Sequence, residues 1–79
     1  MIIVSNQELF ALVRELADIL RDEGAEELAD VLSDALSISS LPGEILGEIR
    51  VALRRVREDA LYKRIDVRRP VDGGIAYVD

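Results

Sequence analysis

Apolar residues recur at helical spacing through most of the chain, and this pattern limits the possible folds more than any other feature. When successive residues are placed about 100° apart, eight apolar residues within positions 9–20 fall on half of a helix circumference, and charged residues occupy the other half. A capping box, Ser5 to Glu8, precedes this run, and Gly24 follows it where a helix-ending glycine adopts a left-handed conformation. The sequence therefore predicts a first helix over residues 6–23.

Two further segments repeat the helical pattern. Residues 25–36 carry apolar residues on one side and acidic residues on the other, which predicts a second helix directly after the first. Because only about two residues separate these helices, they are expected to form an antiparallel or steeply crossed αα-hairpin. Ser40 before Leu41-Pro42 is typical of an N-cap with proline in the first turn, and the apolar stripe that begins at Ile45 predicts a long third helix over residues 41–62.

The C-terminal segment has a different pattern. Ile65 and Val67 alternate with charged residues, and Asp72-Gly73 stands between two β-prone segments, which is a β-hairpin signal. An isolated hairpin is only marginally stable in water, so a mobile tail is the alternative for residues 64–79. The predicted fold for residues 1–79 is a single, mainly α domain with three helices, an αα-hairpin plus one long helix, followed by a C-terminal β-hairpin or mobile tail.

Size and composition narrow the classes of function. The chain has 79 residues and contains neither cysteine nor histidine. Disulfides and zinc sites of the ordinary Cys/His type are therefore impossible, and so small a core favours stabilisation by self-association, most simply as a homodimer. The same absences remove the commonest nucleophiles and bases, and no glycine-rich phosphate motif is present. We therefore predict that the chain is not an enzyme and binds no cofactor.

Charge is divided unequally along the chain. Residues 1–48 contain eleven acids and two bases, whereas residues 49–79 contain eight bases and five acids. The acids of the first two predicted helices lie on outward faces and lack the spacing of a calcium-binding loop. We interpret them either as an ordinary solvated face or as a surface for a basic protein partner. The predicted partner-binding acidic face consists of Asp18, Asp22, Glu26, Glu27, Asp30 and Asp34.

Basic residues form a strip along one flank of the third predicted helix and continue into the C-terminal segment. This strip suggests an alternative function, the binding of nucleic-acid phosphates. The chain-wide negative charge opposes that function, and Glu44 and Glu48 occupy the part of the helix that a helix-turn-helix protein presents to DNA. Nucleic-acid binding is thus the second hypothesis, and its residues are Arg50, Arg54, Arg57, Arg64, Arg68 and Arg69.

A small apolar strip predicts where two copies of the chain meet. With the third helix drawn as far as residue 62, Val51, Leu61 and Tyr62 lie together, away from the main stripe. These side chains would stay exposed on a monomer, so they form the predicted oligomer interface.

Together these features predict a small acidic interaction or regulatory protein that works as a homo-oligomer. An antitoxin-like or immunity-like role is one specific form of this hypothesis, because such proteins cover basic active sites. No motif is specific enough to name a family. The lack of cysteine, of signal-peptide features and of any membrane-length apolar run predicts a cytoplasmic protein that has no membrane partner.

Overall fold

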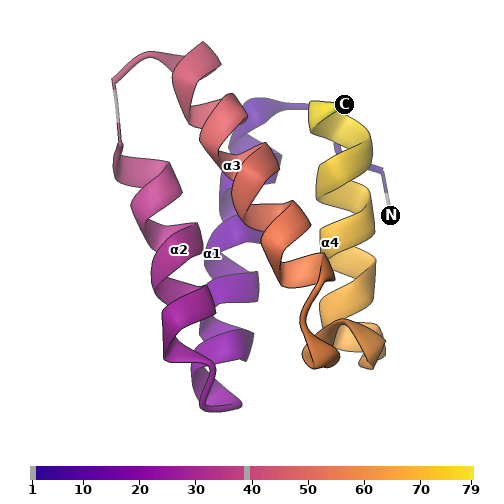
Figure 1. The fold of residues 1–79 in the computed structure, drawn as a ribbon. Helices are drawn as coiled ribbons and strands as arrows, with labels where there is room; N and C mark the ends of the chain where they lie inside the picture. The colour runs from indigo at the N-terminus through magenta and orange to yellow at the C-terminus, as the bar shows by residue number, and fades with distance from the viewer. Residues whose placement is uncertain (1, 39) are drawn as a thin grey trace.

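In the part of the chain that the structure describes, four α-helices pack side by side and run alternately up and down (Figure 1). The computed structural model describes residues 2–38 and 40–79, and this part of the chain contains no strand, so the prediction of a mainly α fold is confirmed. Each helix packs on two neighbours, α1 on α2 and α4, and α3 on α2 and α4. The helices are α1 (Asn6–Asp22), α2 (Glu26–Ser37), α3 (Pro42–Arg57) and α4 (Ile65–Val78), with a 3-10 turn, η1 (Ala60–Lys63), between the last two.

Local sequence signals account for both ends of α1. The Ser5 hydroxyl accepts a hydrogen bond from the Glu8 amide at 3.2 Å, as the capping box predicts. The Glu8 carboxylate accepts hydrogen bonds from the Val4 amide and the Ser5 hydroxyl, both at 3.3 Å. Gly24 ends the helix with φ at +83°, which a side chain would strain. The predicted αα-hairpin of α1 and α2 follows from this sharp turn.

The third helix is shorter than predicted. It ends at Arg57 instead of continuing to residue 62. Asp59 then adopts an extended backbone conformation, and its carboxylate accepts a hydrogen bond from the Leu61 amide at 3.0 Å, which begins η1. In a longer α3 the Leu61 amide would donate a hydrogen bond to a backbone carbonyl one turn earlier. Here it donates to the Asp59 carboxylate instead, because aspartate side chains compete with the backbone for nearby amides.

The predicted C-terminal β-hairpin or mobile tail is wrong, because residues 65–78 form α4. Val67, Val71 and Ile75 recur every four residues on one face of this helix, and at most 8% of each is exposed. Burying three such side chains stabilises the fold by about 5–9 kcal/mol. Pro70 and the two helical glycines cost about 5 kcal/mol in a helix interior. Packing on the other helices therefore outweighs the poor helix propensity of this segment.

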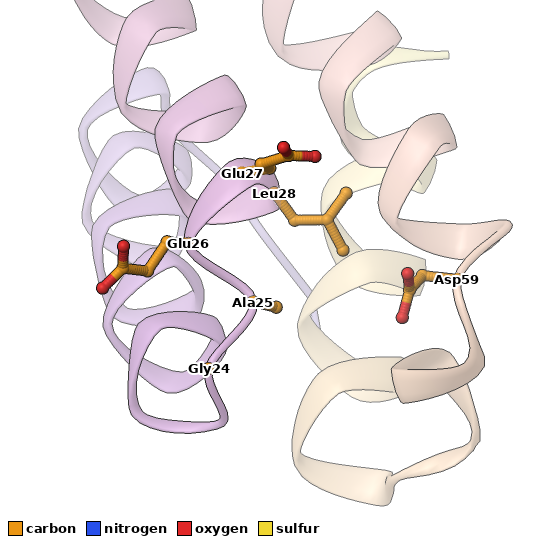
Figure 2. Close-up of a pocket in the computed structure, with 6 residues that line it drawn as sticks. All are labelled: Gly24, Ala25, Glu26, Glu27, Leu28 and Asp59. Atoms are coloured by element: carbon orange, nitrogen blue, oxygen red, sulfur yellow. The ribbon is translucent and has the colours of Figure 1, made fainter.

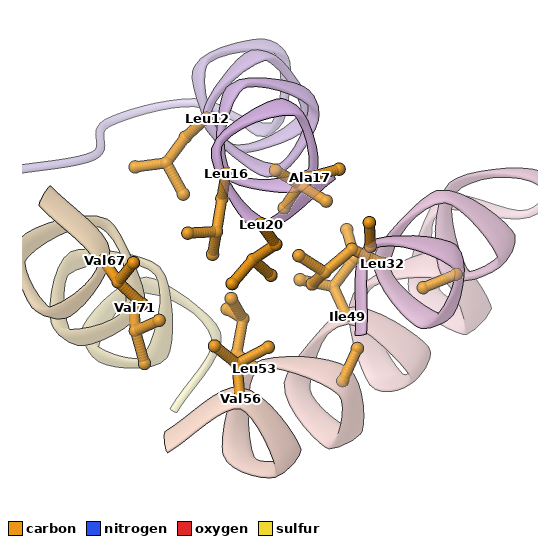
Figure 3. Packing of buried hydrophobic residues seen from close by; sticks show 14 of the residues in the cluster. Leu12, Leu16, Ala17, Leu20, Leu32, Ile49, Leu53, Val56, Val67 and Val71 are labelled. Atoms are coloured by element: carbon orange, nitrogen blue, oxygen red, sulfur yellow. The ribbon is translucent and has the colours of Figure 1, made fainter. Parts of the chain in front are cut away.

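The core lies between the four helices and contains no buried polar or charged residue among those described. Side chains from every helix point to a common centre (Figure 3). The radius of gyration, 11.2 Å, is close to the value of about 11.6 Å expected for a folded chain of this length. Among the described residues, no helix is both long and apolar enough to cross a membrane. The largest fully buried side chains are Leu9, Val13, Leu16, Leu20, Leu32, Ile49, Leu53, Val56, Val67 and Val71.

Candidate functional site

A row of shallow hollows lies between α2 and α3, and we call this row the α2–α3 groove. It consists of three adjoining hollows with volumes of about 400, 290 and 260 Å³. The first two share Glu27, Leu28 and Asp59, and the second and third meet at Arg55. Figure 2 shows its first end, where Leu28 projects from α2 toward Asp59. The groove therefore runs along both helices from the α1–α2 turn to the end of α2.

The far end of the groove is apolar and accessible. Val31, Ile38 and Val51 line it, and relative exposure reaches 58% for Ile38 and 62% for Val51. Ala35 and Ala52, which also line it, are small and almost completely buried. Alanines at these positions leave space between the two helices, while the larger side chains beside them remain in contact with water. An apolar surface of this kind suits a protein partner better than it suits solvent.

Carboxylates surround this groove. Six acidic residues line it against a single base, Arg55. In the described part of the chain, none of the six has a cation within 4.0 Å. The groove consequently carries a local negative field that the fold does not neutralise. The six acids are Glu26, Glu27, Asp34, Glu48, Glu58 and Asp59.

The structure divides the predicted acidic face into two parts. Glu26, Glu27 and Asp34 line the groove, although the carboxylate of Glu26 points away from Asp59 (Figure 2). Two of the other three acids, Asp18 and Asp30, lie around Arg21, whose guanidinium is 4.0 Å from Asp18 and 3.1 Å from Asp30. The third, Asp22, is exposed at the end of α1.

Three acids of the groove, Glu48, Glu58 and Asp59, were not among the predicted site residues. Helical spacing places Glu48 and Asp59 on the same side of the third predicted helix, and this spacing is the one sequence feature that groups them. Their approach to α2 depends on the way α3 packs against it, which periodicity within one helix does not reveal.

Half of the predicted phosphate-binding strip is engaged within the chain. Arg50 and Arg54 bind the Asp79 carboxylate at 2.9 Å and 2.7 Å, and together they hold the pKa of that carboxyl group below its ordinary value. Arg64 binds Asp66 through two parallel hydrogen bonds of 3.0 and 3.1 Å and also pairs with Glu23. Guanidiniums held in this way are less available to phosphates.

The other half of the strip remains accessible. Arg57, Arg68 and Arg69 are exposed, and in the described part of the chain no carboxylate lies within 4.0 Å of them. Arg57 and Arg68 lie close enough to Tyr62 for their charges to act on its phenol. The three arginines of the strip that lack an ion-pair partner in the described chain thus lie near Tyr62 or in the first turns of α4.

The predicted oligomer interface is not one strip. Val51 lies on α3 and lines the groove, whereas Leu61 and Tyr62 belong to η1 and pack in part against the core. Because α3 ends at Arg57, the helical geometry that placed the three side chains together does not apply. Tyr62 also donates a hydrogen bond to Asp72 at 2.5 Å, and this bond is the main cause that raises the pKa of its phenol.

Neither a metal site nor a similarity to known proteins indicates the function of this chain. Within residues 2–38 and 40–79, no group of three or more carboxylates is arranged to hold a metal ion. Comparison with models of protein families, with curated proteins and with solved structures finds no match to this chain.

Proposed function

We propose that this protein is a non-catalytic interaction or regulatory module that acts as a homo-oligomer. The observation that carries the proposal is the α2–α3 groove, where exposed Ile38 and Val51 lie beside the carboxylates of Asp34 and Glu48, and neither carboxylate has an ion-pair partner in the described part of the chain. Apolar side chains supply binding energy when a partner covers them, and charges at their edge select the partner. The groove has both features.

Self-association is supported by size and by further exposed apolar side chains. A chain of 79 residues forms only a small core, so its free energy of unfolding is small. Covering more apolar surface in an assembly would increase that free energy. Ile65, at the start of α4, is 54% exposed and lies beside the unpaired cations Arg68 and Arg69. A second copy of the chain could cover such residues in a dimer or in a larger assembly.

A basic protein partner is a related proposal that rests on the same carboxylates. An antitoxin-like or immunity-like protein would use them to cover a basic active site. Glu27 and Asp34 belong to both the predicted acidic face and the groove, so they are the acids that such a partner would meet together with apolar side chains.

Nucleic-acid binding is the second candidate, and the exposed cations Arg57, Arg68 and Arg69 favour it. They are few, however, and the neighbouring Arg50, Arg54 and Arg64 are held by carboxylates. About three contacts between arginines and phosphates give weak nucleic-acid binding, and salt reduces that binding strongly.

The mass of the protein in solution tests the main proposal. We expect light scattering and sedimentation to give a mass above that of one chain at high micromolar concentration. A monomer over the whole accessible range would contradict the homo-oligomer. Titration with duplex and single-stranded nucleic acid provides the comparison, since micromolar binding near physiological salt would favour the second candidate.

A further inference from the structure

We infer that the α2–α3 groove of one copy binds the basic start of α4 from a second copy. This inference rests on the proposed homo-oligomer and names its interface. The start of α4 presents Ile65, Arg68 and Arg69, spaced three and four residues apart, so the three side chains lie on one face of the helix. All three are exposed. We call this face the α4 basic edge.

The chemistry of the α4 basic edge complements that of the groove. The edge has one exposed apolar side chain, Ile65, next to Arg68 and Arg69, whereas the far end of the groove has exposed Ile38 and Val51 next to Asp34 and Glu48, with Arg55 in the same hollow. In the described part of the chain, the cations Arg68 and Arg69 and the acids of the groove lack ion-pair partners. Contact between two copies would cover apolar surface on both sides and pair charges that the single chain leaves unpaired.

The fold keeps the far end of the groove and the α4 basic edge apart within one molecule. The helices α2 and α4 lie on opposite sides of the core in both Figure 1 and Figure 3, and α2 ends at the opposite end of the bundle from the start of α4. The first end of the groove lies nearer to α4, since Arg64 pairs with Glu23 beside the α1–α2 turn. Each copy therefore presents the far end of the groove and the α4 basic edge on different sides. A contact between different surfaces is heterologous, so it joins copies head to tail and does not by itself produce a two-fold dimer.

Two such contacts per protomer are compatible with its total surface area. A standard interface covers about 800 Å² on each partner. One protomer exposes 4825 Å² in total, so two contacts of that size would use about a third of its surface. Because part of the attraction comes from exposed charges, the association weakens as salt is added.

Paired charge reversals test the inference with the full-length chain. The groove variant combines Glu27→Lys with Glu48→Lys, and the edge variant combines Arg68→Glu with Arg69→Glu. Each variant alone would place like charges across the contact, so we expect its dissociation constant for self-association to rise at least about tenfold. An equimolar mixture restores opposite charges at every contact, so it should associate about as well as the unmodified chain.

A matched control variant distinguishes the loss of interface contacts from the effect of the changed net charge. Glu15→Lys with Glu44→Lys makes the same charge change on α1 and α3, at exposed positions outside the groove. This control should associate at least as strongly as the unmodified chain. Circular dichroism and thermal melting verify that each variant folds.

Cysteine cross-linking gives a second readout that does not depend on charge reversal. The chain has no cysteine, so disulfides can form only where they are introduced. Mixing Val51→Cys protein with Ile65→Cys protein under mild oxidation should give mainly the mixed disulfide, and more of it than mixing Val51→Cys with Ile2→Cys.

The outcomes distinguish this interface from the proposed function. If the unmodified chain associates but the mixture does not recover association, or if the groove and edge variants associate as before, the interface is wrong and the homo-oligomer stands. A monomeric unmodified chain overturns both. Binding of a basic amphipathic peptide in the groove of such a monomer would identify a foreign partner instead of a second copy.

Discussion

Two helical glycines in this protein should respond in opposite ways to the same substitution. A Cβ atom built on Gly74, in α4, would lie 2.7 Å from Cδ1 of Leu53, with methyl groups of Leu9 and Leu12 at 3.6 and 3.7 Å. A Cβ built on Gly47, in α3, meets nothing within 4 Å. Gly74→Ala therefore overfills the core, whereas Gly47→Ala only removes a flexible residue from an exposed helix position.

The expected magnitudes follow from two opposing effects. Alanine is more favourable than glycine in a helix interior by about 1 kcal/mol, and both variants gain this amount. Overpacking a core costs about 1–3 kcal/mol. Leu53 is completely buried and cannot turn its methyl group toward solvent, so Gly74→Ala bears this cost. The free energy of unfolding should rise by about 1 kcal/mol for Gly47→Ala and change by about 0 to −2 kcal/mol for Gly74→Ala.

Urea unfolding measures both variants under the same conditions. The helix-propensity gain cancels in the comparison, so the difference between the two unfolding free energies isolates the overpacking cost. In thermal melting, 1 kcal/mol corresponds to about 4–8 °C for a domain of this size. Equal stabilisation of the two variants would refute the close approach of α4 to Leu53 and would weaken the packing described for that helix.

Three further predictions concern single hydrogen-bonded or charged groups. Ser5→Ala removes the α1 cap and should lower the free energy of unfolding by about 1 kcal/mol in urea titrations, whereas Ser33→Ala, inside α2, should change it much less. The lowered pKa of Asp79 contributes stability that is present above about pH 4 and lost as pH falls through the lowered pKa, so the difference in melting temperature from Asp79→Asn should shrink as the solution is acidified below about pH 4. The raised pKa of Tyr62 predicts that this phenol ionises later than a free tyrosine in ultraviolet titration, and that Asp72→Asn reduces the delay; an unchanged titration curve would contradict the hydrogen bond.

The groove shows how tertiary packing selects among residues that look alike in the sequence. Glu27 and Asp30 both lie on the acidic side of α2, but only Glu27 lines the groove, while Asp30 pairs with Arg21. The same holds for the arginines, since Arg54 pairs with Asp79 and Arg57 remains unpaired in the described chain. Helical periodicity predicts the face on which a charge lies, whereas its partner is decided by which helix packs beside that face.

Local sequence signals are sufficient to predict the first half of the fold, α1 and its turn into α2. The ends of α1 depend on Ser5, Glu8 and Gly24, whose hydrogen bonds and backbone angle are local, so a short window contains the necessary information. The second half of the fold, and α4 above all, depends on packing between helices. Pro70 and the Asp72-Gly73 pair disfavour a helix locally, yet α4 forms because its apolar face is buried against α1 and α3, and that gain exists only once those helices are in place.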